Sequence, residues 1–165
     1  YSVASVVGLI SIEIFGYKYE ETKNYAVNLG YALQLTNILR DIKTDKDRGY
    51  IYIPQEDLDR FNYSEKDLKN EVYSENFVDM MRFQTQRVRD YYHKARTSLR
   101  PDERPTILAA EIMDAIYYRL LEKIELKEFN VYERKIRVST IHKILLTFKH
   151  WLSMKIFVGR IKRHS

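Results

Sequence analysis

The sequence of 165 residues contains no cysteine, only five glycines and only three prolines. The lack of cysteine excludes disulfide bonds and thiolate metal sites. Scarce glycine and proline disfavour an all-β fold, which would need many tight turns. Long hydrophobic runs are also missing, because no apolar stretch reaches the roughly 18 residues that a membrane-spanning helix needs.

Charge is unevenly distributed along the chain, whose formal net charge is +5. Residues 134–165 contain nine Lys and Arg and no Asp or Glu, which leaves 19 basic and 23 acidic residues, a net charge of −4, in residues 1–133. A protein that coats nucleic acid would be basic over its whole surface. We therefore expect an acidic body with a basic end, and no nucleic-acid partner.

Apolar residues recur at helical spacing through most of the chain, which predicts an all-α fold. We expect long helices over residues 1–15, 20–45, 76–99, 105–129 and 139–158, and short ones after Pro54 and Ser64. Tyr50 to Ile53 alternate in a way that could form a short extended piece. The helical pattern is already present at the first residues without a helix start signal, so we expect a further segment upstream of Tyr1.

The second predicted helix carries a stripe of polar residues on one face. Spacings of three, four and four residues bring the members of the stripe together: Gln34, Asn37, Asp41 and Asp45. The residues around them are mostly Leu and Ile, and the first half of the stripe is uncharged amide rather than Lys or Glu. This pattern is typical of a helix that lines a polar cavity inside a bundle.

Asp41 and Asp45 lie one helical turn apart, and their carboxylates would repel each other if both were ionised and unpaired. A divalent cation relieves this repulsion, and Mg²⁺ prefers carboxylate oxygens completed by phosphate oxygens. The pair therefore predicts a Mg²⁺ site for a diphosphate, and Arg40 could reach the same phosphate. The alternative is a solvated surface cluster of charges, together with Lys43, Lys46 and Arg48.

The segment LQLTNILRD at residues 33–41, followed by Asp45 and by RGYIYIP at residues 48–54, resembles the second aspartate-rich motif of the squalene/phytoene synthase family. Residues 3–16 and 117–124 are similar to other segments of that family. The resemblance covers most of residues 1–133. Within the family, the sequence looks most similar to bacterial presqualene diphosphate synthases.

This resemblance implies that residues 1–165 form the C-terminal part of an all-α isoprenoid synthase bundle around a central cavity. The implied reaction is head-to-head condensation of two prenyl diphosphates, farnesyl or geranylgeranyl, with Mg²⁺-assisted loss of diphosphate. The product would be of the presqualene, squalene or phytoene type. Catalytic roles would fall to Asp41 and Asp45, which would hold the metal, and to Tyr117, with Tyr118 as the alternative. Substrate-binding roles would fall to Gln34, Asn37 and Arg40.

The family has two aspartate-rich motifs on facing helices, and this sequence contains one of them. The other would lie upstream of Tyr1, and Tyr50 stands where many relatives have Arg. We therefore expect about half of an active site, which would not catalyse condensation alone. The alternatives are a terpene cyclase-like class I synthase, and a catalytically silent helical module that binds a membrane or a partner through its basic end.

Residues 139–165 predict a basic amphipathic terminal helix. Apolar residues from Ile141 to Ile156 share one face, and Lys and Arg dominate the remainder. Such a helix could lie on an anionic membrane, or it could pack on its own bundle and leave a soluble basic end, which is the interpretation we favour. We expect a cytoplasmic protein that this helix could bring to a membrane surface, and the sequence indicates no oligomeric state.

Overall fold

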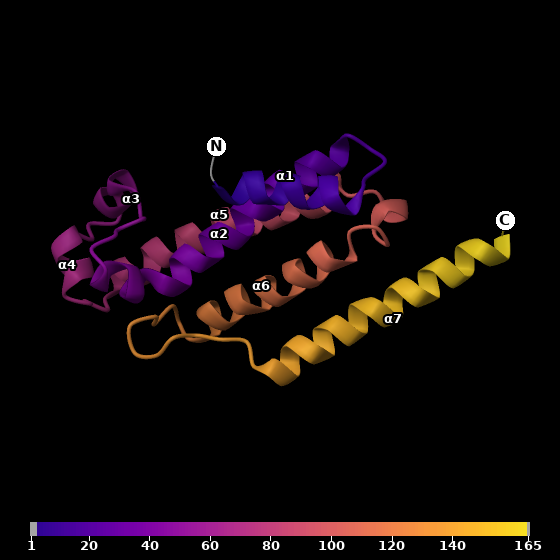
Figure 1. Ribbon diagram of the computed structural model, residues 1–165. Helices are drawn as coiled ribbons and strands as arrows, with labels where there is room; N and C mark the ends of the chain where they lie inside the picture. The colour runs from indigo at the N-terminus through magenta and orange to yellow at the C-terminus, as the bar shows by residue number, and fades with distance from the viewer. Residues whose placement is uncertain (1–2, 165) are drawn as a thin grey trace.

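Helix α2 (Glu21–Asp47) runs through the middle of the computed structural model, which describes residues 3–164 (Figure 1). Helix α1 (Val3–Phe15) packs against α2 on one side, and α5 (Glu75–Ser98) packs along it on another. Helix α6 (Leu108–Leu126) contacts both α2 and α5, and α7 (Thr140–His164) packs against α6. The described residues form no strand, which confirms the all-α prediction.

The core lies where α2, α5 and α6 meet. Helix α5 contributes a buried apolar side that begins at Phe77 and ends near Ala95, as the helical spacing predicts. Tyr92 is fully buried, and its hydroxyl lies 3.2 Å from the Thr36 hydroxyl of α2. Tyr91, the preceding residue, is only half-buried. The buried stripe thus turns slightly around the helix, because 3.6 residues per turn do not repeat evenly.

Two short helices, α3 (Gln55–Arg60) and α4 (Glu65–Lys69), cover one end of the bundle (Figure 1). Ser64 caps α4: its hydroxyl accepts from the Asp67 backbone N–H, and the Asp67 carboxylate accepts from the Ser64 N–H. This reciprocal pair of hydrogen bonds is a capping box, which fixes the start of the short helix that we expect after Ser64. Residues 50–53 are irregular rather than a strand, since none of the described segments offers them a partner strand.

Helix α6 is shorter than predicted at both ends. Residues 101–103 form a 3₁₀ turn, in which the buried Glu103 accepts a hydrogen bond from the Lys18 backbone N–H, and α6 begins only at Leu108. At the other end, Glu128 and Phe129 both have positive φ, which ends the helical path after Leu126. Helix α7 ends at His164, beyond residue 158, where apolar spacing predicts its end, and within the predicted basic terminal helix of residues 139–165.

Helix α1 crosses α2 at its closest point beside Gly8. A Cβ atom added at Gly8 would lie 2.6 Å from the carbonyl oxygen of Ala26, which is backbone and cannot turn away. Gly8 is therefore required by the close approach of the two helices.

The Gly8→Ala variant should lose about 1–2 kcal/mol of unfolding free energy, because α1 must move away from α2. Urea denaturation followed by circular dichroism measures this loss. Ile10→Ala, at an exposed position on the same helix, is the matched control and should change stability by less than about 0.5 kcal/mol. Equal stability of Gly8→Ala and the native chain would show that the crossing is not tight.

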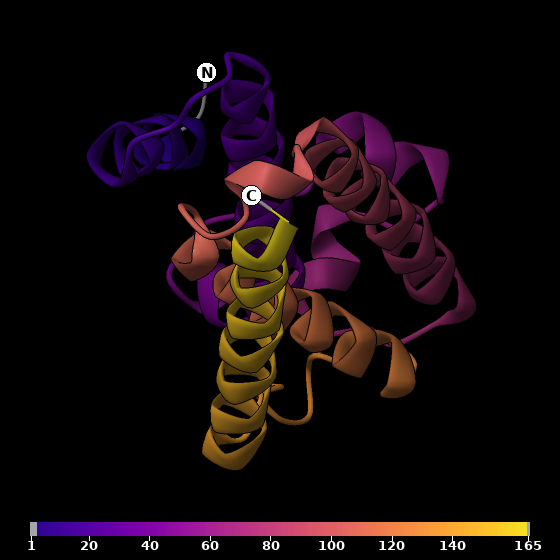
Figure 2. The same ribbon diagram turned by 90° about the vertical axis from the view of Figure 1, so that its right-hand side faces the viewer.

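Helix α7 and helix α1 lie on opposite edges of the bundle (Figures 1 and 2). Helix α7 packs on its own bundle through α6, as the interpretation that we favoured from the sequence expects. Its apolar face does not take part in this packing, because large apolar side chains such as Ile141 and Phe148 remain exposed. None of the described helices is both long enough and apolar enough to cross a membrane.

Candidate functional site

The polar stripe lies on α2 near its C-terminal end. Asn37, Asp41 and Asp45 are half-buried, whereas Gln34, one turn earlier, is exposed. These residues share one face because α2 is a single unbroken helix from Glu21 to Asp47, so their spacing in the sequence sets their positions around the helix. The structure therefore places three of the four predicted residues together, and the cavity-lining role of Gln34 stays a prediction.

Asp41 is held by two cations. The guanidinium of Arg40 donates to both carboxylate oxygens, with Nε 3.0 Å from Oδ1, and Nζ of Lys135 lies 2.9 Å from Oδ1. The Asp41 side chain is only 16% exposed. Burial raises the pKa of Asp41, but the hydrogen bonds from Arg40 and Lys135 outweigh burial, so its pKa lies below the ordinary value. Asp41 is therefore an ionised carboxylate near neutral pH.

Lys135 is the residue that sequence reasoning missed. It lies in the loop between α6 and α7, far from Asp41 in the sequence, and only the folded chain brings the two together. The signal in the sequence was weak: Lys135 stands near the start of the basic segment that begins at Arg134. A basic segment alone does not predict which carboxylate its residues reach.

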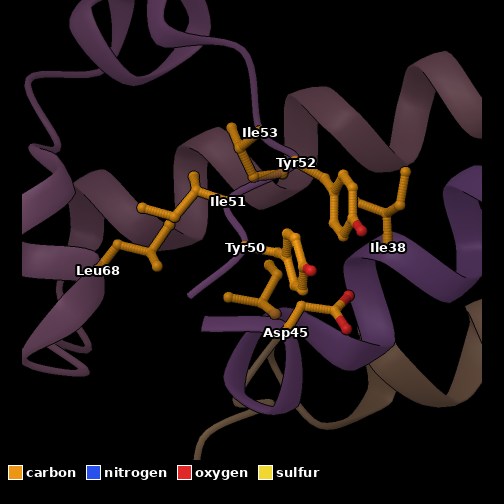
Figure 3. Close-up of a pocket in the computed structure, with 8 residues that line it drawn as sticks. Ile38, Asp45, Tyr50, Ile51, Tyr52, Ile53 and Leu68 are labelled. Atoms are coloured by element: carbon orange, nitrogen blue, oxygen red, sulfur yellow. The ribbon is translucent and has the colours of Figure 1, made fainter. Parts of the chain in front are cut away.

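Asp45 differs from Asp41, because no ion pair holds it in the described structure. Burial and the charge of Asp41 raise the pKa of Asp45, and the more distant cations only partly offset this. Figure 3 shows the Asp45 carboxylate beside the stacked rings of Tyr50 and Tyr52, whose centroids are 6.0 Å apart. The hollow between these side chains and Ile38 measures about 10 Å³, which is room for little more than a water molecule.

A Mg²⁺ ion would find suitable donors on this face of α2. Oδ1 of Asn37 is buried and lacks a hydrogen-bond partner, and one and two turns further along lie the carboxylates of Asp41 and Asp45. All three are hard oxygen donors of the kind that Mg²⁺ prefers. Among the residues that the structure describes, no cluster of three or more His, Asp and Glu side chains could hold a metal. A bound Mg²⁺ would therefore need further oxygens, and phosphate and water are the usual source.

Tyr117 is the α6 tyrosine nearest to this site. It is half-buried, and it is among the groups that raise the pKa of Arg40, after the hydrogen bond that Arg40 donates to Asp41. Tyr118 instead accepts a hydrogen bond from Arg89 and packs edge-on against Tyr92, with ring centroids 5.1 Å apart. Because Tyr118 is committed to the α5–α6 packing, Tyr117 is the better candidate for a residue that faces the site.

Comparison with known proteins gives the family. The family model described as "Squalene/phytoene synthase" matches residues 1–142. The chain belongs to this family. It is 36% identical over 168 residues to the 15-cis-phytoene synthase of a Synechocystis species. The matched region covers 94% of this chain and 50% of the relative. It is 37% identical over 161 residues to the phytoene synthase of Arthrospira platensis, covering 88% of this chain and 51% of that one.

A solved structure confirms the isoprenoid synthase fold that the resemblance implied. A dehydrosqualene synthase crystallised with a ligand superposes with a TM-score of 0.75 at 26% identity, covering 93% of this chain and 54% of that chain. The chain thus spans about half the length of the squalene/phytoene synthases that it matches. The finer resemblance to presqualene diphosphate synthases stays a prediction, since the relatives described above are named for phytoene and dehydrosqualene.

Proposed function

We propose that this chain forms the Mg²⁺- and diphosphate-binding half of an enzyme that condenses two prenyl diphosphates head to head. One observation carries the proposal. Asn37, Asp41 and Asp45 offer oxygen donors along one half-buried face of α2, in a chain of the squalene/phytoene synthase family. The names of the relatives support this reaction class over a terpene cyclase or a silent helical module.

Asp41 and Asp45 are the proposed metal ligands. When bound, Mg²⁺ would neutralise charge on the departing diphosphate. Arg40 and Lys135 now share Asp41, so a metal on that carboxylate would release their N–H groups toward phosphate oxygens. The planar donors of Arg40 suit a phosphate, and Lys135 supplies a compact charge. The same two cations would thus hold Asp41 in the absence of substrate and hold the diphosphate in its presence.

Tyr117 is the proposed residue for the cationic stage of the reaction. Loss of diphosphate from a prenyl chain leaves an allylic cation, and the face of an aromatic ring attracts positive charge. Tyr117 lies on α6 within electrostatic reach of Arg40, so its ring could approach the carbon from which diphosphate departs. Tyr118 should be dispensable for this role, because Arg89 and Tyr92 already hold it.

The experiment that tests this function is calorimetric titration of the chain with farnesyl and geranylgeranyl thiodiphosphate, which resist loss of diphosphate. Binding should require Mg²⁺ and should fail when the cation is chelated. In a parallel turnover assay with the natural diphosphates, we expect no condensation product from this chain alone. Thiodiphosphate binding of equal affinity with and without Mg²⁺ would contradict the proposed role of the carboxylates. Formation of a condensation product by this chain alone would contradict the proposal that it holds half of the active site.

Replacing Lys135 with Met should have opposite effects on the two ligands. Diphosphate binding in the presence of Mg²⁺ should weaken about tenfold, because one charged donor is lost at a partly exposed position. Binding of Mg²⁺ alone should strengthen, because a cation that competes for Asp41 is removed. Titration of each ligand measures both effects, with Lys127→Met, an exposed lysine at the end of α6, as the control. A loss of both affinities would show that Lys135 serves mainly to hold the fold.

A further inference from the structure

Helix α7 presents an apolar face that the described protein does not cover. The large apolar side chains on this face are between 42% and 70% exposed. They are Ile141, Ile144, Leu145, Phe148, Trp151, Leu152 and Ile156. A contiguous exposed apolar surface of this kind marks an interaction site far more often than an ordinary solvated surface.

The exposed apolar face of α7 lies on the side of the helix opposite to the one that contacts α6. The side of α7 that faces α6 is marked by half-buried residues at spacings of four: Leu146, His150 and Met154. Burial lowers the pKa of His150, which is consistent with its position against the bundle. On a helical wheel Phe148 and Leu152 lie nearly opposite His150. Helix α7 is therefore attached by its narrower, less apolar side.

Aromatic rings and lysines are combined on this face. The rings of Phe148 and Trp151 stack with centroids 5.9 Å apart, and Nζ of Lys155 lies 5.2 Å from the Trp151 ring centroid. Lys149 is also exposed and borders this face, whereas Lys143, seven residues before His150, lies toward the side that faces α6. Tryptophan and lysine together are typical of the boundary between lipid headgroups and acyl chains, where a ring is buried and an ammonium group reaches the phosphates.

An apolar groove flanks the same face. It lies between α6 and α7, has a volume of about 410 Å³, and is lined mainly by Leu108, Ile112, Ile144, Phe148 and Trp151. The groove carries no acidic side chain. The charged side chain among its lining residues is Lys143, which is exposed and can keep its ammonium group in water while a hydrocarbon chain lies against α7.

We propose that α7 lies on an anionic lipid surface, with its apolar face among the headgroups and upper acyl chains and its lysines on the lipid phosphates. Charge complementarity favours lipid over a protein partner. Residues 134–165 contain nine basic and no acidic residues, whereas lysine is depleted in the cores of protein interfaces. The net charge of −4 on residues 1–133 would be repelled by the same surface, so α7 should face the membrane and the body should face away.

Trp151 is the only tryptophan in the chain, so its fluorescence reports on this face alone. We expect its emission to shift to the blue when vesicles of phosphatidylglycerol and phosphatidylcholine are added, and the chain to sediment with them. Vesicles of phosphatidylcholine alone should bind at least about tenfold more weakly, because the electrostatic attraction is missing. High salt should weaken binding to the anionic vesicles.

Two variants distinguish binding through this face of α7 from non-specific adsorption of the protein to vesicles. Replacing Lys149 and Lys155 with Gln should lower the affinity for anionic vesicles at least about tenfold. The matched control removes the same number of exposed lysines elsewhere: Lys66 and Lys94. The control should bind like the native chain. Phe148→Ser should abolish the blue shift while the circular dichroism spectrum stays unchanged, since Phe148 is exposed.

Two results would overturn the proposal. One is Trp151 emission that does not respond to anionic vesicles at any lipid concentration. The other is emission that is already blue-shifted without lipid, in a chain that sediments as a dimer, because a second copy of the protein would then cover the face. Neither result bears on Mg²⁺-dependent diphosphate binding, so failure here would leave the proposed function standing.

Discussion

The double variant Asp41→Asn and Asp45→Asn is expected to weaken Mg²⁺-dependent diphosphate binding at least about a hundredfold. Asn keeps the size of each side chain but removes the negative charge that attracts a hard cation. Charged ligands at a partly buried site contribute more than neutral ones, and two are lost together. The Asp41 side chain is only 16% exposed. Titration with a prenyl thiodiphosphate, at fixed Mg²⁺, measures the effect.

The control for this variant is Asp90→Asn, which removes a carboxylate from the exposed surface of α5. It should bind diphosphate like the native chain. Thermal unfolding should be recorded for both variants, because loss of the Asp41 charge leaves Arg40 and Lys135 without their partner. Native-like binding by the double variant, with the fold intact, would remove these two residues from the site.

The Asp57→Ala variant should destabilise the fold more than the Gly8→Ala variant does. Asp57 is 4% exposed, and one of its carboxylate oxygens accepts from Nε2 of Gln84 at 2.7 Å and from Nη1 of Arg87 at 2.9 Å. Removing this acceptor leaves a buried amide and a guanidinium without their partner. Because the Arg87 side chain is 39% exposed and can turn toward water, we expect a loss of about 2–3 kcal/mol.

Urea denaturation measures this loss, and Asp59→Ala on the same short helix is the control. Asp59 is exposed and contacts Gln55 one turn away, so its removal should change the unfolding free energy by less than about 0.5 kcal/mol. The pair Asp57→Ala and Gln84→Leu should show a coupling energy of about 1 kcal/mol or more. Equal effects of the Asp57 and Asp59 variants would show that the Asp57 network does not hold α3 onto α5.

The helices and the polar stripe could be predicted because both are local. Helical spacing places Asn37, Asp41 and Asp45 on one face of α2 whatever the rest of the chain does, and the Ser64 cap depends on a residue only three positions away. The family resemblance then assigned chemistry to that face, and the family model confirms the membership.

The remaining contacts could not be predicted, because they join residues that are distant in the sequence. Nothing in the local pattern pairs Lys135 with Asp41, or Asp57 with Gln84. The positive φ angles at Glu128 and Phe129 could not be predicted from the sequence either, since neither residue is a glycine, the residue that most often adopts such a conformation. Periodicity identified the apolar face of α7 but did not indicate whether that face meets the bundle or points away from it.

The central claim is that Asp41 and Asp45 together hold the metal of a bound diphosphate. The most direct measurement is a crystal structure of the chain with Mn²⁺ in place of Mg²⁺ and a prenyl thiodiphosphate, in which anomalous scattering locates the metal. The account predicts a metal about 2.1 Å from a carboxylate oxygen of each aspartate, with Arg40 or Lys135 moved from Asp41 to the phosphate. A metal and diphosphate bound elsewhere, while Arg40 and Lys135 both remain on Asp41, would contradict it.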